Sequence, residues 1–132
     1  MRDFVQQDET KMNGQTSKAL RIALLVFAIL WGVYGLLHVV SPELMMARDP
    51  SIERVLGAAV VTFALGAALA YREKAWDKVK IVVLVLIASM ILYTVTMVWG
   101  ILAGGISSAA WPPTIIGAVF AIVLMVLCTR EK

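Results

Sequence analysis

Asp, Glu, Lys and Arg are absent from three long stretches of this 132-residue chain, residues 22–42, 55–71 and 81–129. The only ionisable side chains in them are the single histidine, one cysteine and three tyrosines. Of the whole chain, 61% is hydrophobic, which is more than a soluble domain of this size can bury. A helix needs about 20 apolar residues to cross a bilayer. Because the last stretch is long enough for two spans, we predict four transmembrane helices, over 19–40, 52–71, 79–103 and 113–128.

The predicted fold is therefore all-α, with one four-helix transmembrane domain over residues 18–132. A polar cytoplasmic tail, residues 1–17, precedes it. Ser41 before Pro42 is the pattern of a helix start, since serine caps the first turn and proline needs no N–H there. This pattern predicts a short interfacial helix, about 42–47, after the first span.

Lysine and arginine gather on one side of the predicted membrane. With both termini in the cytoplasm, every Lys and Arg except Arg48 and Arg54 lies on the cytoplasmic side, as the positive-inside rule requires. We expect a multi-pass protein of the plasma or inner membrane. Its net charge of +3 is not clustered on a soluble module, so no nucleic-acid partner is predicted. Glu53 and Arg54 are expected to form a solvated rim.

Several kinds of membrane chemistry lack their residues here. No Asp, Glu, Lys or Arg lies in the middle of a predicted span, which excludes a small multidrug exporter with an embedded carboxylate. Cys128 is the only cysteine, so a CxxC thiol oxidoreductase is excluded. One histidine cannot supply both axial ligands of a bis-histidine haem. We predict that the chain is not an enzyme.

The single histidine, His38, carries the site hypotheses. Trp31, Tyr34, Gly35 and His38 share one face of the first predicted helix, because they are spaced three and four residues apart. His38 lies near the outer end of that helix. We therefore predict a cofactor-binding or small-molecule site formed by His38 with Tyr34 and Gly35.

The occupant of this site stays open. A haem- or chlorophyll-type macrocycle would lie against Gly35, and a quinone or lipid head group would hydrogen-bond to His38. A copper site with Met45 and Met46 is a third option, since thioether and imidazole ligands suit copper, but the prediction is no metal. The structural alternative is a histidine bonded to a neighbouring helix or to Glu43.

Small residues recur at intervals of four in two of the predicted helices, forming ridges that let helices approach closely in lipid. We predict that these ridges mediate helix packing, within the chain or against another chain: Ala58, Thr62, Gly66 and Ala70, and then Thr96 and Gly100. Tryptophan is enriched at membrane interfaces, and the predicted interfacial anchors are Trp31, Trp99 and Trp111.

Two segments carry a family resemblance. "GLLHVVSPELMM" followed by "ERVLGAAVVTFALGAALAYRE" resembles the DoxX-like group of small bacterial four-helix membrane proteins, including its uncharacterised relatives. The residues that fit are Gly35, Pro42, Gly57 and Gly66, which the resemblance implies are structural. It also implies a link to membrane redox or quinone-related roles, and no catalytic residue.

Three functions follow as hypotheses. The first is a non-catalytic accessory or structural subunit that packs in a larger membrane complex or homo-oligomer. The second is a DoxX-like protein that binds a quinone or other lipophilic small molecule near His38 in redox balance. The third is a small transporter, which requires a polar cavity built from the few polar side chains of the spans: Thr62, Ser89, Tyr93, Thr94 and Thr96.

Overall fold

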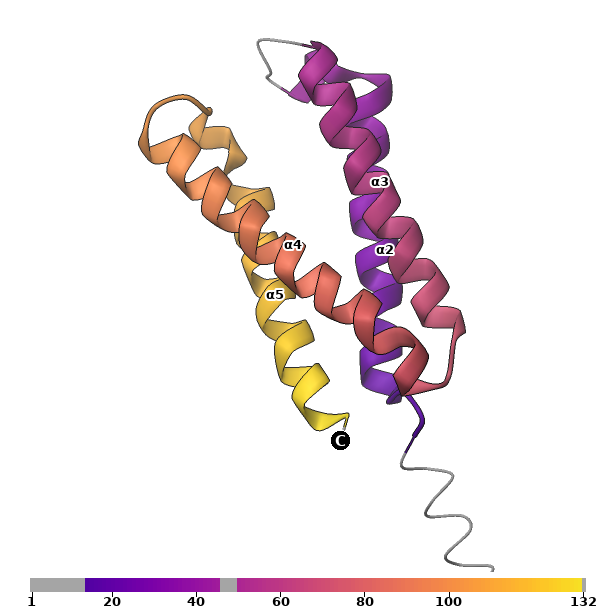
Figure 1. The fold of residues 1–132 in the computed structure, drawn as a ribbon. Helices are drawn as coiled ribbons and strands as arrows, with labels where there is room; N and C mark the ends of the chain where they lie inside the picture. The colour runs from indigo at the N-terminus through magenta and orange to yellow at the C-terminus, as the bar shows by residue number, and fades with distance from the viewer. Residues whose placement is uncertain (1–13, 46–49, 132) are drawn as a thin grey trace, which may run out of the picture.

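The computed structural model describes residues 14–45 and 50–131, and the described chain is almost entirely helical (Figure 1). Four of its helices are long and apolar enough to cross a membrane. The described part contains no β-strand beyond one isolated bridge, between Gln15 and Ala75. The elements, in order, are α2 (Lys18–Val40), the 3₁₀ turn η1 (Pro42–Met45), α3 (Pro50–Arg72), α4 (Trp76–Leu102), the 3₁₀ turn η2 (Ser108–Ala110) and α5 (Trp111–Arg130).

Helix α2 begins and ends where its flanking residues require. The Ser17 hydroxyl accepts a hydrogen bond from the Leu20 N–H (3.2 Å), which caps the first turn. At the other end, Ser41 N–H still bonds to a helix carbonyl, but Pro42 has no N–H to continue the ladder. The predicted short helix appears as the 3₁₀ turn η1 over 42–45, and its predicted remainder, 46–47, lies outside the described residues.

The other three helices are each longer than their apolar runs. Their predicted cores, 52–71, 79–103 and 113–128, lie inside α3, α4 and α5 apart from the last residue of the second. Helix α4 begins at Trp76, three residues before the predicted start at residue 79. The added residues include Asp77, and an acidic side chain is favourable in the first turn of a helix. Helix α5 begins at Trp111, and the two prolines that follow occupy first-turn positions where no N–H is needed.

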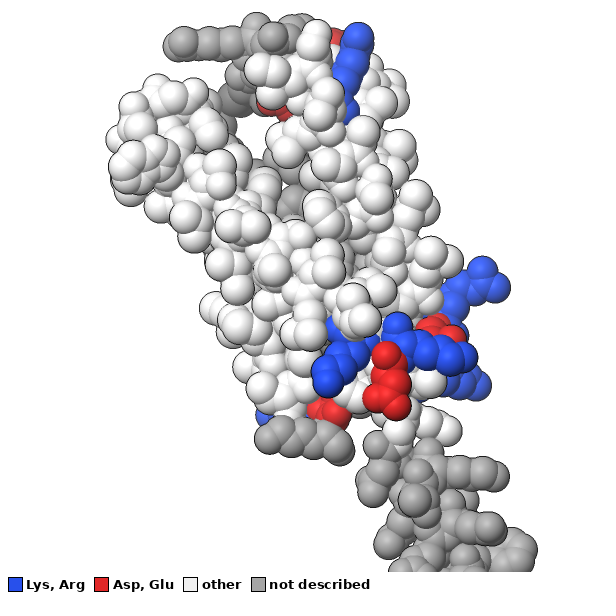
Figure 2. Space-filling view, viewed as in Figure 1, with Lys and Arg blue, Asp and Glu red and all other residues white. Residues whose placement is uncertain are grey.

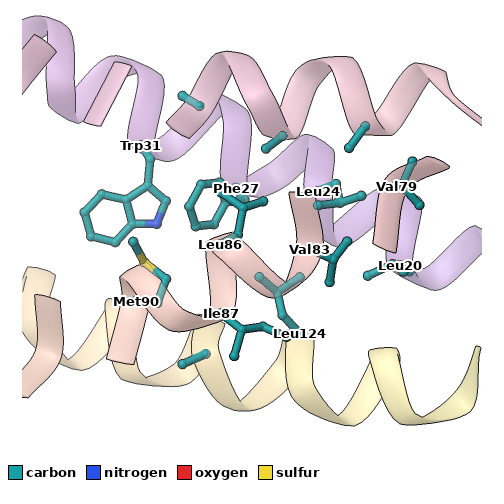
Figure 3. Close-up of a cluster of buried hydrophobic side chains, with 14 of the residues drawn as sticks. Leu20, Leu24, Phe27, Trp31, Val79, Val83, Leu86, Ile87, Met90 and Leu124 are labelled. Atoms are coloured by element: carbon teal, nitrogen blue, oxygen red, sulfur yellow. The ribbon is translucent and has the colours of Figure 1, made fainter. Parts of the chain in front are cut away.

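The helices form two antiparallel hairpins, α2 with α3 and α4 with α5 (Figure 1). The hairpins converge at the end where α3 connects to α4 and diverge toward the opposite end. Buried side chains from all four helices fill the convergent half (Figure 3). Helix α4, described in full, has no buried residue after Met90, so the shared core ends there.

Charged and apolar residues divide the surface into a polar end and an apolar body. The outward faces of the four helices expose large apolar side chains such as Val40 (73%), Ile81 (71%) and Leu92 (67%). Lys and Arg gather at the convergent end (Figure 2). An apolar belt of membrane-spanning length beside a charged end is the surface expected of a multi-pass membrane protein.

The residues before α2 are packed on the convergent end. Thr16 N–H donates to the Lys74 carbonyl (2.7 Å), and Trp76 N–H donates to the Gly14 carbonyl (2.9 Å). Ser17 N–H donates to the Glu131 carboxylate at 2.9 Å, which joins the start of α2 to the end of α5. The predicted tail of residues 1–17 is thus docked over 14–17, and residues 1–13 lie outside the described residues.

Glu73 closes the turn between α3 and α4. Its carboxylate accepts hydrogen bonds from the backbone N–H groups of Ala75 (3.1 Å) and Lys74 (2.9 Å), and these bonds hold the pKa of Glu73 below its usual value. A depressed folded-state pKa stabilises the fold above the unfolded-state pKa, and this contribution is lost as the pH falls through the folded value.

We therefore expect the melting temperature of the wild type to fall on acidification below about pH 4.3. In the variant Glu73→Gln, which keeps the acceptor oxygen but cannot titrate, that part of the pH dependence should be missing. The check is the difference in melting temperature between the two proteins from pH 3 to pH 7. A difference that does not change over this range would contradict the expectation.

Candidate functional site

His38 lies in the last turn of α2 and is almost fully buried, with 3% of its surface exposed. Its Nδ1 atom forms a hydrogen bond with Oε2 of Glu53, in the first turn of α3. The Glu53 side chain is only 14% exposed, so the predicted solvated rim is wrong at this residue. The neighbouring Arg54 is exposed, as expected of a rim residue. The structural alternative for His38, a bond to a neighbouring helix, is present, and its partner is Glu53.

Two glycines bring α2 and α3 together beside His38. A Cβ atom built at Gly57 would lie 2.7 Å from the Gly35 carbonyl oxygen and 2.7 Å from Cβ of His38. A Cβ atom at Gly35 would lie 3.0 Å from the Gly57 carbonyl oxygen. The backbones therefore touch at this point, and no larger residue fits without a shift. Their contact holds the last turn of α2, which carries His38, beside the first turn of α3, which carries Glu53.

A row of aromatic rings continues from His38 into the molecule. The His38 ring lies edge-to-face with Tyr34, at 4.4 Å between centroids, and Tyr34 in turn with Trp31, at 5.4 Å. Trp31 also meets Tyr93 of α4 edge-to-face at 5.3 Å. These rings join the α2–α3 hairpin to α4 just beyond the shared core. Edge-to-face packing of this kind fixes ring orientations.

Helix α5 supports Tyr93 from behind. A Cβ atom at Gly117 would lie 3.1 Å from the Tyr93 ring, so the ring rests directly against the α5 backbone. Gly117 is buried, as is Thr114 one turn earlier. All four long helices thus contribute to the position of the site.

Two polar atoms of this cluster are buried and have no hydrogen-bond partner among the described residues. They are Nε2 of His38 and the hydroxyl of Tyr93, but the Tyr93 hydroxyl lies beside the hydroxyl of Tyr34, which is its hydrogen-bonding neighbour. The Trp31 indole nitrogen is also unpartnered. Figure 3 shows that this nitrogen faces the core while the six-membered ring faces away from it. Unpartnered buried polar groups are costly, so Nε2 of His38 marks a place where a polar ligand atom would be stabilising.

The site lies where the two hairpins separate. Figure 2 shows the surface hollowed between the hairpins toward their divergent end. Beyond Met90, α4 buries none of its residues. Trp31, 3% exposed, closes the core below this hollow. A histidine, a carboxylate and two tyrosines thus lie between the end of the shared core and the divergent end of the molecule.

The predicted cofactor-binding residues are therefore found together, but not in equal roles. Tyr34 contacts His38, and Gly35 lies against Gly57 of α3, so its face is covered by a helix and a flat macrocycle has no room there. No group of three or more His, Cys, Asp or Glu side chains lies close enough to hold a metal ion within residues 14–45 and 50–131. Of the copper alternative's ligands, Met46 and the Met45 side chain lie outside the described part.

The predicted small-residue ridges are placed unevenly. Ala70 is buried and Gly66 half-buried, but Ala58 and Thr62 are exposed, as is Thr96. Gly100 packs against Ile106 in the connection to α5. A step of four residues turns about 40° further than one full helical turn, so a ridge of this period rotates away from the contact face. The α3 residues that are buried instead alternate steps of three and four: Gly57, Val60, Ala64 and Ala67.

The three predicted tryptophan anchors differ in environment. Trp99 and Trp111 are exposed by 75% and 37%, near the ends of α4 and α5 that face the connection between them. Trp31 is instead a core residue, 3% exposed, and the prediction of an interfacial anchor is wrong for it. The reason is its position, since it lies in the middle of α2 on the face that meets α4.

Three of the five polar side chains expected to line a transport cavity are bonded within their own helices. Thr62, Ser89 and Thr94 each donate to the carbonyl four residues earlier, at 2.7 to 2.9 Å. Such bonds satisfy the hydroxyls without a partner helix. The Tyr93 hydroxyl instead lies beside that of Tyr34, on another helix.

Sequence reasoning missed Glu53 and Tyr93 as site residues. One signal was present for Glu53: a short connection between antiparallel helices places the last turn of one beside the first turn of the next, and His38 and Glu53 occupy those turns. Tyr93 had no comparable signal, because it belongs to the other hairpin.

Comparison of the chain with protein-family models, with curated proteins and with solved structures finds no match.

Proposed function

We propose that this chain is a non-catalytic, multi-pass membrane protein that binds a lipophilic small molecule between its two hairpins, with the polar head of that molecule at His38. The observation that carries the proposal is Nε2 of His38, which is buried and has no hydrogen-bond partner among the described residues. Few polar groups inside membrane helices are left without a partner unless they serve a ligand or pathway. The proposal corresponds to the quinone-type role that the DoxX-like resemblance implies.

The shape of the site favours an elongated apolar molecule. The helices carry many exposed apolar side chains, and the polar atoms of the site gather around His38, in the last turn of α2. A molecule with one polar head and an apolar tail would place its head at His38 and its tail between the hairpins. Ligand sites with mostly apolar walls and a few polar groups are the usual form of small-molecule sites in proteins.

The charge distribution supports an orientation for the protein in its membrane. All the described Lys and Arg residues except Arg54 lie at the convergent end. The positive-inside rule assigns the end that is rich in Lys and Arg to the cytoplasm. Both termini of the described chain lie at that end (Figure 1). We therefore place the termini in the cytoplasm and the His38 site toward the opposite face of a plasma or inner membrane.

The test is the set of lipophilic molecules that co-purify with the protein. Wild type, His38→Ala and the control Thr62→Ala are purified in mild detergent, and their organic extracts are compared by mass spectrometry. Thr62 is an exposed hydroxyl residue on α3 that bonds within its own helix, which makes it a matched control. We expect one class of molecule in wild type and Thr62→Ala that is reduced at least about tenfold in His38→Ala. Identical extracts from all three proteins would refute the proposal.

A second candidate function is an accessory subunit of a larger membrane assembly. The observation that favours it is the exposed small-residue face of α3, with Ala58 and Thr62 outside the chain's own contacts. Small residues on an outward face allow another helix to approach closely. Protein bands in the same preparations separate the two candidates, because a stoichiometric second chain supports a subunit and a lipophilic molecule without one supports a binding protein.

A further inference from the structure

A half-buried arginine near the start of α2 is held in place without an acidic partner among the described residues. We propose that Arg21, together with the exposed Lys18, Arg72 and Lys74, binds the phosphate of an anionic phospholipid in the surrounding leaflet. This site lies at the opposite end of α2 from His38. The inference therefore goes beyond the proposed ligand and rests only on the proposed position in the membrane.

Two contacts with the last turn of α3 hold the Arg21 side chain. Its Nε–H donates to the Tyr71 carbonyl oxygen at 3.1 Å, and its guanidinium carbon lies 5.2 Å from the centre of the Tyr71 ring. The last carbonyls of a helix have no partner within that helix, and Arg21 supplies one for Tyr71. Because a guanidinium is planar, holding Nε in this way also fixes the direction of its two terminal nitrogens.

The terminal nitrogens of Arg21 are left for another acceptor. Within residues 14–45 and 50–131 they have no hydrogen-bond or ion-pair partner. A phosphate can accept two parallel hydrogen bonds from such a guanidinium edge, which makes arginine–phosphate pairs both strong and specific in geometry. Arg21 is therefore oriented for a phosphate by its contact with Tyr71.

Two of the three described acidic residues at this end bind other groups. Glu73 accepts two backbone N–H groups of its turn and pairs with Lys78, at 3.6 Å between Oε2 and Nζ. Glu131 accepts the Ser17 N–H at 2.9 Å. Seven described Lys and Arg residues lie at this end against three Asp and Glu residues, which leaves a net charge of +4 (Figure 2). A charge of this sign attracts anionic head groups.

The position of Arg21 favours a lipid phosphate over a soluble anion. Arg21 directly precedes an uncharged apolar stretch, residues 22–42. Ile22 and Leu69, exposed by 50% and 67%, belong to the apolar surface that begins at this level of α2 and α3. A phosphate at Arg21 would lie at head-group depth, with its acyl chains along that surface. Basic groups at the cytoplasmic ends of transmembrane helices are established sites for anionic lipids.

The experiment measures how much lipid stays bound to the whole chain in native mass spectrometry. Dioleoyl phosphatidylglycerol, which is anionic, and dioleoyl phosphatidylcholine, which is zwitterionic, are offered at equal concentration in mild detergent. We expect the wild type to retain phosphatidylglycerol at least about fivefold better, the effect of one basic residue near an anionic head group. Equal retention of the two lipids overturns the inference.

A matched pair of variants tests whether the site is local. Arg21→Gln should reduce the preference for phosphatidylglycerol to less than about twofold. Lys80→Gln removes the same charge from an exposed position at the same end and should keep the wild-type preference. Equal losses in the two variants would leave only a diffuse attraction and overturn the site. His38→Ala should also keep the preference, so the two proposals are tested separately.

Arg21→Lys separates geometry from charge. Lysine keeps the positive charge but lacks the planar fork that makes two parallel bonds, so the preference should fall at least about twofold in protein that still unfolds cooperatively. A folded Arg21→Lys with the wild-type preference overturns the role of the guanidinium. If neither Arg21 variant folds, Lys18→Gln replaces them, because Lys18 is exposed and three residues earlier on the same face. Its preference should be at least about twofold below that of Lys80→Gln, and equality of the two would overturn the inference.

Discussion

Gly57→Ala is expected to destabilise the protein by about 3 kcal/mol, the upper end of the range for overpacking a close contact. The added methyl group would lie 2.7 Å from both the Gly35 carbonyl oxygen and Cβ of His38. The Gly35 oxygen belongs to the backbone, and Cβ of His38 is bonded directly to the backbone. Neither atom can therefore move aside as the end of a flexible side chain can. Helices α2 and α3 must separate, and van der Waals contact is what holds helices together in lipid.

The matched control is Gly66→Ala, on the same helix. Its added methyl group would meet only Val82 Cγ1, at 3.8 Å, which is an ordinary contact. Alanine is favoured over glycine inside a helix by about 0.5–1 kcal/mol, so this variant should be as stable as wild type or slightly more. The fluorescence of the four tryptophans during thermal unfolding in detergent measures both. Equal melting temperatures for the two variants would mean that the α2–α3 contact is looser than described.

Glu53→Ala should produce the second large loss, about 3 kcal/mol, because it removes the one hydrogen-bond partner that a buried histidine has among the described residues. His38 is 3% exposed and cannot turn to water without opening the hairpin. Arg54→Ala, one position along and exposed, should change stability by less than about 0.5 kcal/mol. The measurement is again thermal unfolding in detergent.

A double-mutant cycle separates the interaction from the loss of either side chain. When His38→Leu is combined with Glu53→Leu, neither polar side chain of the pair is left buried without the other, and the double variant should be more stable than the sum of the single losses predicts. The expected coupling energy is about 2 kcal/mol. Additive losses would show that the two side chains stabilise the fold independently, and the site would then lack its fixed histidine orientation.

The lengths and ends of the helices could be predicted from the sequence because they depend on local features. Uncharged runs set the four spans, and Ser17, Pro42 and the prolines after Trp111 set helix ends through their own hydrogen-bonding capacity. The face of α2 that carries Tyr34 and His38 followed from helical spacing alone.

The partners of His38 could not be predicted in the same way, because they depend on how the hairpins pack. The choice between the ridge beginning at Ala58 and the contact face beginning at Gly57 is a rotation of α3 by one residue, about 100°, and both faces consist of small residues. Tyr93 lies near His38 because Gly117 lets the Tyr93 ring rest against α5. This contact forms within the α4–α5 hairpin, yet it positions Tyr93 beside residues of the α2–α3 hairpin.

The end of the shared core at Met90 has a consequence for how a ligand arrives. Figure 2 shows the surface hollowed between the hairpins beyond it, and in the proposed membrane orientation a sideways opening there would face lipid. A lipophilic molecule would enter from within the bilayer, where partitioning has already concentrated it relative to water. Occupancy would then follow the mole fraction of the molecule in the lipid, and diluting the sample with buffer at constant lipid-to-protein ratio would release little of it.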